Sequence, residues 1–261
     1  MVRRLSFISL AAGLAAASLF AQGPGRRFGG GPGGDFSMVR AEFGLSNKVV
    51  PGAPYSAQVV TQFTQTLSNG DHIQRTTTAS MARDSQGRTR MDRSLATVGA
   101  LSATAGGQAR VVMIHDPVAG MSYALDPASH TARSMPIPAA RTGLAGAHAR
   151  AERTQASAKT EDLGTQVMQG VSAQGKRVTR AIPAGEEGNE KEIDIVTETW
   201  YSPDLQVVVM SKTSDPRFGE SVYQLNAINR TEPDPALFAV PADYSVTAGR
   251  PMMRQRPAPA Q

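Results

Sequence analysis

Three strand-like runs near the C-terminal end constrain the fold of this chain more than any other feature. They are joined by two reversals that contain proline, Ser202–Leu205 and Asp215–Gly219. Proline at the second turn position holds φ at about −65°, and the Ser or Asp before it can accept a backbone hydrogen bond. The runs are rich in Val, Ile, Thr, Tyr and Trp, which pack well on a pleated surface. The sequence therefore predicts an antiparallel meander with strands at 192–201, 206–212 and 220–228.

The same strand and turn signals occupy the region before this meander. Residues 55–67 alternate between apolar and polar side chains, and Asn69-Gly70 suits a tight hairpin turn into a return strand at 72–83. Further strand-like runs follow, at 88–95, 110–115, 121–125, 131–135 and 162–182. Short strands at regular spacing favour one continuous sheet. We therefore predict a mainly β fold: a single curved antiparallel sheet, a half-barrel-like meander, with one or two short helices.

Three segments are candidates for the short helices. Apolar residues at helical spacing occur in 36–44, and a weakly amphipathic piece lies in 145–159. Asp234-Pro235 opens at most one helical turn, which would end at Phe238. The piece 145–159 lies inside 136–164, where Ala, Arg, Gly, Thr and Ser dominate. A segment of that length and composition indicates a long loop that is flexible or functional.

The N-terminus has the pattern of a secretory signal peptide. Arg3 and Arg4 precede an Ala- and Leu-rich run, and Ala21 is a plausible last residue before cleavage. The alternative is a retained membrane anchor, for which the apolar run of about 16 residues is short against the roughly 20 that a span needs. The expected organisation is a signal peptide at 1–21, a Gly-rich linker at 22–35, a β-rich half-barrel-like domain at 36–247 with a long flexible loop at about 136–164, and a disordered tail at 248–261.

Charge and cysteine content exclude several classes of function. The net charge is +5, but seven of the 27 basic residues lie in the two termini, 1–34 and 249–261, which contain no acidic residue. The rest of the chain therefore has 20 basic against 22 acidic residues. That balance argues against a nucleic-acid partner. The absence of cysteine excludes disulfides, thiolate chemistry and Cys-ligated metals, and no cofactor is expected.

Motifs for catalysis or metal binding are not found in the sequence. There is no G-x-S-x-G nucleophile turn, no H-E-x-x-H and no EF-hand pattern. His115 beside Asp116 is the best acid–base candidate for a hydrolase, but this pairing also occurs at ordinary strand ends. Four arginines near the turn at 84–87 suggest either an anion site or a solvated sheet edge. They are Arg83, Arg88, Arg90 and Arg93. We predict no catalytic residue and no metal site.

Apolar residues on the predicted strands are the better candidates for a functional site. A strongly curved sheet can enclose an apolar cavity, and side chains on its inner surface would then contact a ligand. In a flat or closed sheet the same residues would fill the core. The candidate ligand-binding residues are Val59, Phe63, Met113, Tyr123, Trp200, Val207, Val209, Tyr223 and Leu225.

The order of several short motifs resembles the lipoprotein-carrier superfamily, which includes the periplasmic lipoprotein chaperone and the sigma-factor regulatory sensor. The motifs at the C-terminal end are Trp200–Leu205, Val222–Leu225, Pro235–Phe238 and Pro241–Tyr244. The middle of the chain, with Arg83–Arg90 and Asp116–Gly120, resembles uncharacterised exported bacterial proteins. The resemblance covers roughly 55–247 and is carried by turns and apolar strands.

The resemblance implies an unclosed β-barrel with helices across its concave side and an apolar pocket for acyl chains. The chain departs from that pattern before the first strand, where the long amphipathic helix of the family is shortened or missing at 36–49.

The function expected from these features is that of an exported, non-enzymatic periplasmic protein that binds an apolar ligand, either a lipid or a lipoprotein acyl chain, in its curved sheet. Two alternatives remain open: an envelope protein-interaction or sensor module without a small ligand, and a hydrolase of unknown type. The expected partners are a lipid or lipoprotein, or an envelope protein. After removal of the signal peptide, the chain is not expected to be an integral membrane protein.

Overall fold

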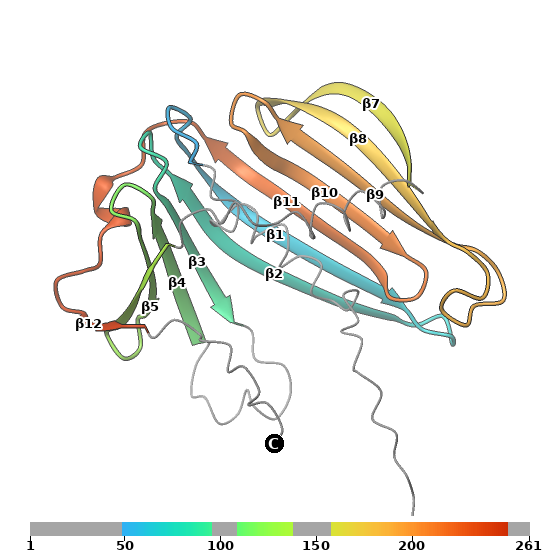
Figure 1. The fold of residues 1–261 in the computed structure, drawn as a ribbon, viewed down its shortest axis with the longest axis horizontal. Helices are drawn as coiled ribbons and strands as arrows, with labels where there is room; N and C mark the ends of the chain where they lie inside the picture. Colours follow the sequence, from blue (N-terminus) through green and yellow to red (C-terminus); the bar gives the residue numbers. More distant parts are fainter. Residues whose placement is uncertain (1–48, 96–108, 138–157, 250–261) are drawn as a thin grey trace, which may run out of the picture.

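The computed structural model describes residues 49–95, 109–137 and 158–249, and these form one open, curved sheet (Figure 1). In this part of the chain the one helical element is the 3-10 turn η2 (Pro235–Phe238). The mainly β, single-sheet prediction is therefore confirmed. The strands are β1 (Tyr55–Thr66), β2 (His72–Arg83), β3 (Thr89–Leu95), β4 (Ala109–Asp116), β5 (Met121–Asp126), β6 (Thr131–Pro136), β7 (Ala158–Met168), β8 (Val171–Ile182), β9 (Ile193–Ser202), β10 (Val207–Asp215), β11 (Gly219–Asn229) and β12 (Ser245–Ala248).

Two antiparallel meanders meet in the middle of the sheet. The strand order is β12-β6-β5-β4-β3-β2-β1-β11-β10-β9-β8-β7, so β1–β6 and β7–β11 each follow chain order. The meanders are joined by the long-range antiparallel pair β1–β11, in which Val59 lies opposite Leu225. One pair differs from the antiparallel prediction, because β12 runs parallel to β6.

The strand boundaries follow the predictions closely, with two differences. β7 begins at Ala158, whereas a loop was expected up to residue 164. β7 lies at the edge of the sheet and most of its side chains are exposed, so no alternation of apolar and polar residues marks it. β12 has four exposed residues and was not predicted for the same reason. The expected signal peptide, linker, C-terminal tail from 250 onward, helix at 36–44, most of the helix at 145–159 and the centre of the long loop lie outside the described residues.

Irregular pairing makes one end of the sheet curl back on itself. The register shifts within β11, β10 and β7, and Ala227 in β11 has a φ of 51°, which is typical of a bulge. The Ala227 N–H donates a hydrogen bond of 3.2 Å to Oε1 of Gln169, which lies in the turn between β7 and β8. Two strands separate β8 from β11 in the sheet order, so this bond requires strong curvature.

The curl encloses the larger of two hydrophobic clusters. The side of β1 that carries Tyr55, Ala57 and Val59 is called the inner face. Side chains on the neighbouring strands that lie opposite these residues in the register belong to the same face. The cluster joins these residues to the curled end of the sheet. Its buried members are Tyr55, Ala57, Val59, Met81, Val171, Ala173, Trp200, Leu205, Val207, Val209, Tyr223 and Leu225.

A close contact fixes Trp200 within this cluster. Trp200 lies opposite Gly175 of β8 in the register, and its ring covers that glycine. A Cβ atom at position 175 would lie 2.6 Å from Cη2 and Cζ3 of the indole, well inside van der Waals contact. Gly175 is therefore required by the position of the tryptophan ring.

The second cluster lies on the opposite, outer face. Val112 and Ile114 of β4 are buried with Leu125 of β5 and Ala132 of β6. The chain after η2 returns across this side and packs Val240 and Tyr244 against them. The two ends of the sheet thus bury opposite faces.

The turn between β2 and β3 binds two segments to the sheet: the one just before β1 and the one just after β11. Asp84 is 1% exposed, and its carboxylate accepts hydrogen bonds from the Gln86 and Arg88 backbone N–H groups and from Arg88 Nε. Ser85 donates to the Glu232 carboxylate and accepts from the Gly52 N–H.

Two of the four arginines near this turn help to hold it. The Arg88 guanidinium lies 5.3 Å from the Phe238 ring centroid, and Arg90 Nη1 donates to the Leu237 carbonyl. Both arginines therefore attach η2 to the sheet. From the sequence, they had been expected to form either a solvated sheet edge or an anion site.

We expect Gly175→Ala to destabilise the protein by roughly 1–3 kcal/mol, because the added methyl group must displace the Trp200 ring from a packed cluster. Urea unfolding measures this, with Lys176→Ala, at the exposed neighbouring position, as the control. A Gly175→Ala variant as stable as the parent would show that the indole does not lie against this glycine.

We expect Asp84→Ala to cost about 2–3 kcal/mol, since three donors lose a buried, charged acceptor. Asp126→Ala is the matched control, because Asp126 also accepts from its own turn but is exposed, and the loss there should be much smaller. Thermal and urea unfolding of both variants test this. Equal losses at the two positions would contradict the role assigned to the β2–β3 turn.

Candidate binding face

The structure brings six of the nine predicted ligand-binding residues together inside the larger cluster. Each is at most 8% exposed, and Val209 and Leu225 are completely buried. The six are Val59, Trp200, Val207, Val209, Tyr223 and Leu225. At this end of the sheet, apolar side chains from β1, β9, β10 and β11 pack against one another. Their contact with a ligand stays a prediction.

The other three predicted residues are half-buried and lie apart. Met113 is on the inner face of β4, opposite Met91 and Ala124. Tyr123 is on the outer face, opposite Ile114, and packs against the second cluster. Phe63 lies on the inner face toward the other end of β1, between Arg75 and Ser221.

A row of methionines crosses the inner face from β2 to β4. Met81, Met91 and Met113 lie directly opposite one another on three adjacent strands. Met81 and Met91 are buried and Met113 is half-buried, so the row becomes more accessible toward β4. Tyr55 Oη donates to Met81 Sδ at 2.8 Å, which connects the row to the cluster. Met81 and Met91 were not predicted as site residues, although pairing the predicted hairpin strands would have placed them side by side.

A row of polar side chains lies next to the methionine row on the same face. On β2, β3 and β4 its members are two residues away from the methionine, all toward the same edge of the row. The polar row consists of Arg83, Thr89, His115 and Ser122, which are in register across β2 to β5. Arg83 is buried, donates through Nε to the Ala53 carbonyl and through Nη2 to the Leu205 carbonyl, and lies over the Tyr55 ring.

A band of hydroxyl groups covers the inner face beyond the larger cluster. It consists of Thr61, Thr77, Thr197, Thr199, Ser211, Thr213 and Ser221, which the register places on the same side. Thr197 Oγ1 and Thr213 Oγ1 lie 3.4 Å apart. The sequence predicted an apolar inner surface, but in this region the polar residues of the alternating pattern face inward. The apolar part of the inner face is therefore limited to the cluster and the methionine row.

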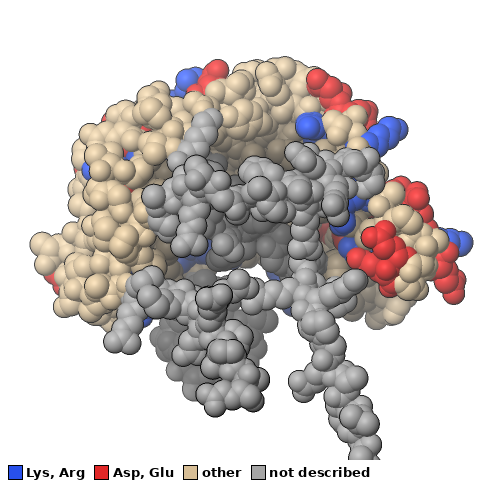
Figure 2. Space-filling model, viewed as in Figure 1, with Lys and Arg blue, Asp and Glu red and all other residues tan. Residues whose placement is uncertain are grey.

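Ion pairs between neighbouring strands lie on the outer face. Arg177 pairs with both Glu161 and Glu198 across β7, β8 and β9, and Lys212 pairs with Glu220 across β10 and β11. The hydrogen bonds that Arg177 donates to Glu198 and Glu161 raise the pKa of its guanidinium. In the space-filling view, most of the visible charged side chains lie around the outside of the arch (Figure 2).

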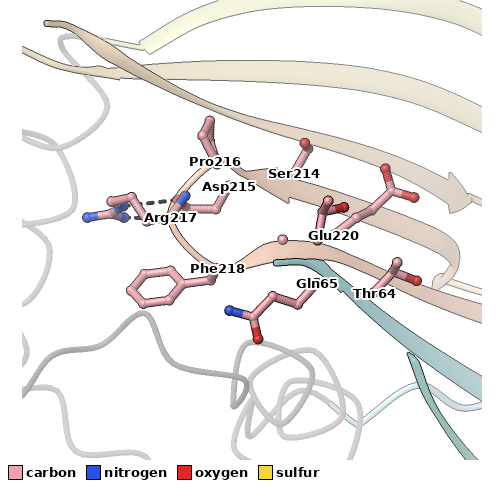
Figure 3. A pocket seen from close by; sticks show the side chains of 10 residues that line it. Thr64, Gln65, Ser214, Asp215, Pro216, Arg217, Phe218 and Glu220 are labelled. Atoms are coloured by element: carbon pink, nitrogen blue, oxygen red, sulfur yellow. Dashed lines mark hydrogen bonds and ion pairs between the residues drawn. The ribbon is translucent and has the colours of Figure 1, made fainter. Parts of the chain in front are cut away.

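A polar pocket of about 440 Å³ lies where the β10–β11 turn meets the end of β1 (Figure 3). Gln65 and Phe218 are among its lining residues. The Arg217 guanidinium turns back to Asp215, and its hydrogen bond to that carboxylate lowers the Asp215 pKa. Arg217 also pairs with Glu187. The cation is thus neutralised by its own neighbours, which makes the pocket a poor site for an anion or an apolar chain.

His115 and Asp116, the acid–base candidates from the sequence, do not pair with each other. His115 Nδ1 lies 2.9 Å from Ser122 Oγ, whereas Asp116 accepts the N–H groups of Val118 and Ala119 in its own turn. Burial lowers the pKa of His115, although the nearby Asp116 charge partly opposes this. His130 Nδ1 lies 2.6 Å from the Asp243 carboxylate, and both side chains are exposed.

The described residues contain neither a metal-binding group nor a membrane-spanning helix. No group of three or more His, Asp or Glu side chains is arranged to hold a metal ion there. Within residues 49–95, 109–137 and 158–249, no helix has the length and apolar character of a membrane span.

Comparison with known proteins finds similarity in structure only. No protein-family model and no curated protein matches the sequence. The Pseudomonas aeruginosa MucA/MucB complex matches with a TM-score of 0.41 and 13% identity, over 80% of this chain and 60% of that one. An uncharacterised conserved protein from Thermus thermophilus matches with a TM-score of 0.40 and 9% identity, over 82% and 96% of the two chains.

A LolA superfamily protein from Nitrosomonas europaea also matches, with a TM-score of 0.30 and 10% identity, over 78% of this chain and 96% of that one. The chain spans about 60% of the length of the MucA/MucB structure that it matches.

Proposed function

We propose that this protein is an exported, non-enzymatic periplasmic binding protein that holds an apolar ligand, a lipid or the acyl chain of a lipoprotein, on the inner face of its curved sheet. The observation that carries the proposal is the methionine row. It extends the apolar surface of the larger cluster across three strands and becomes accessible at Met113.

The chemistry of methionine suits a ligand of variable shape. Its side chain is unbranched and polarisable, and it adapts to irregular apolar surfaces. An acyl chain lying across Met81, Met91 and Met113 would gain apolar burial at each strand that it crosses. The interstrand ion pairs are confined to the outer face, so such a chain would not have to displace them.

The boundary of the proposed site follows from the side chains around the row. The hydroxyl band lies beyond the cluster, toward the β10–β11 turn, and would discourage an apolar chain from extending that way. Phe63 lies on the far side of Thr61 from the cluster, and its contribution should be smaller than that of Met113.

Protein expressed as the full chain and purified from the exported fraction should carry co-purified lipid that native mass spectrometry detects. After lipid extraction, it should bind a fluorescent fatty acid such as cis-parinaric acid in a saturable way. Finding neither bound lipid nor saturable binding would overturn the proposal, even if the protein captured a protein partner.

We expect Met113→Asn to weaken fatty-acid binding by about tenfold or more, because covering a side chain of this size contributes roughly 1.5–3 kcal/mol. Phe63→Asn should have a smaller effect. Val60→Asn is the matched control, since Val60 is half-buried on the outer face of β1. Titration of the same fluorescent fatty acid measures all three variants. An equal loss for Val60→Asn and Met113→Asn would mean that the inner face is not the binding surface.

A further inference from the structure

The polar row beside the methionines contains a buried hydroxyl group without a partner. Thr89 is 7% exposed, its Oγ1 is buried, and that oxygen makes no hydrogen bond in the structure. Leaving such a group unpaired is costly, and native proteins usually satisfy it with a side chain, a water or a bound molecule. A hydroxyl group in this position therefore points to a partner other than the described residues, and a bound molecule can supply it.

The residue opposite Thr89 offers a second free polar atom. Thr89 and His115 are directly paired across β3 and β4, where side chains on one face lie about 5 Å apart at Cβ. His115 Nδ1 is engaged by Ser122 Oγ, and Nε2 makes no hydrogen bond with the described residues. Burial lowers the His115 pKa, which favours the neutral ring. When Nδ1 accepts the Ser122 hydroxyl hydrogen, Nε2 carries the ring hydrogen and can donate it to an acceptor.

The charges around the row favour a group that accepts hydrogen bonds. Arg83 places a buried guanidinium at the β2 end of the row. The two nearest carboxylates in the sequence are used elsewhere, Asp84 by Arg88 and its own turn, and Asp116 by the turn that follows β4. The register places no acidic side chain within the row itself. A carbonyl oxygen, which is an acceptor and carries no proton, fits these surroundings.

We propose that Thr89 and His115 form the polar end of the ligand site and bind the carbonyl oxygen of an acyl lipid, as a carboxylate or as an ester. The inference rests on the proposed function, because the acyl chain is taken to lie along the methionine row. On β2, β3 and β4 a methionine lies two residues from the member of the polar row, so a chain leaving Thr89 and His115 meets Met91 and Met113 next. The ligand class is thus an amphipathic lipid with a carbonyl-bearing head.

The test compares three ligands that share a long chain and differ at the head: oleate, methyl oleate and 1-octadecene. Each competes with a bound fluorophore that has no carbonyl group, 1-aminoanthracene, on the purified full chain. Thr89→Val removes the hydroxyl and keeps the shape of the side chain, whereas Thr89→Ser keeps the hydroxyl. Thr77→Val is the control, because Thr77 is a threonine on the same inner face that lies in the hydroxyl band and is half-buried, whereas Thr89 is buried.

Thr89→Val should weaken oleate, methyl oleate or both by about three- to tenfold, as expected for one neutral hydrogen bond, and leave 1-octadecene unchanged. Thr89→Ser and Thr77→Val should bind all three ligands as the parent does. A loss confined to oleate assigns the head as a carboxylate, and a loss confined to methyl oleate assigns it as an ester. His115→Leu is a second variant that should show the same selective loss, which covers the case in which Thr89→Val does not fold.

Two results would overturn the inference. Unchanged binding of both carbonyl ligands by Thr89→Val would mean that the hydroxyl is satisfied by water or is simply unpaired. An equal loss for 1-octadecene would mean that the substitution acts on the fold. If the parent protein binds none of the three ligands, the proposed function and this polar end both fail, whereas binding that is insensitive to position 89 removes the polar end alone.

Discussion

The structure depends on the burial of one apolar cluster inside the curl of the sheet. The chain has no cysteine, and aromatic residues are 5% of it, so neither disulfides nor a large aromatic core can stabilise the fold. The bulges in β11, β10 and β7 allow the strands to turn until the β7–β8 end reaches β11. Aliphatic side chains of β1, β10 and β11 then pack with Val171 and Ala173 of β8 in a single cluster.

The curl also separates the two faces by chemistry. Interstrand ion pairs occur on the outer face, where water screens them and they cost little to form. On the inner face, the methionine row is level with Ala57 of the cluster and the polar row is level with Tyr55. This order of apolar and polar side chains on one surface is what an amphipathic ligand needs. Within this surface the Thr89 hydroxyl is buried and makes no hydrogen bond with the described residues.

The β2–β3 turn connects these features to the rest of the chain. Asp84 organises the turn, Arg88 and Arg90 attach η2, and Glu232 binds Ser85. Arg83, in the same motif, points the other way and reaches the Leu205 carbonyl in the β9–β10 turn. One short segment thus positions the first residues of the polar row and holds the chain that covers the second cluster.

Alternation, turn residues and strand spacing were sufficient to predict the strands between Tyr55 and Asn229 other than β7, because each is a local property of a half-buried strand. Local signals failed at β7 and β12, which are mostly exposed edge strands without alternation. They also failed to distinguish core from binding surface. Val59, Val209 and Leu225 look the same in the sequence whether they line a cavity or fill a cluster, and the curvature decided that they are packed together.

The amino-acid sequence by itself determined a mainly β chain with one curved sheet, proline-bearing reversals and no cysteine chemistry, since these follow from residue type and near neighbours. Tertiary structure alone decided which residues share a face. Met81, Met91 and Met113 come from three strands, as do Arg83, Thr89 and His115, and only the pairing register places each set side by side. Register depends on contacts between distant parts of the chain, and one residue of shift would send every side chain to the opposite face.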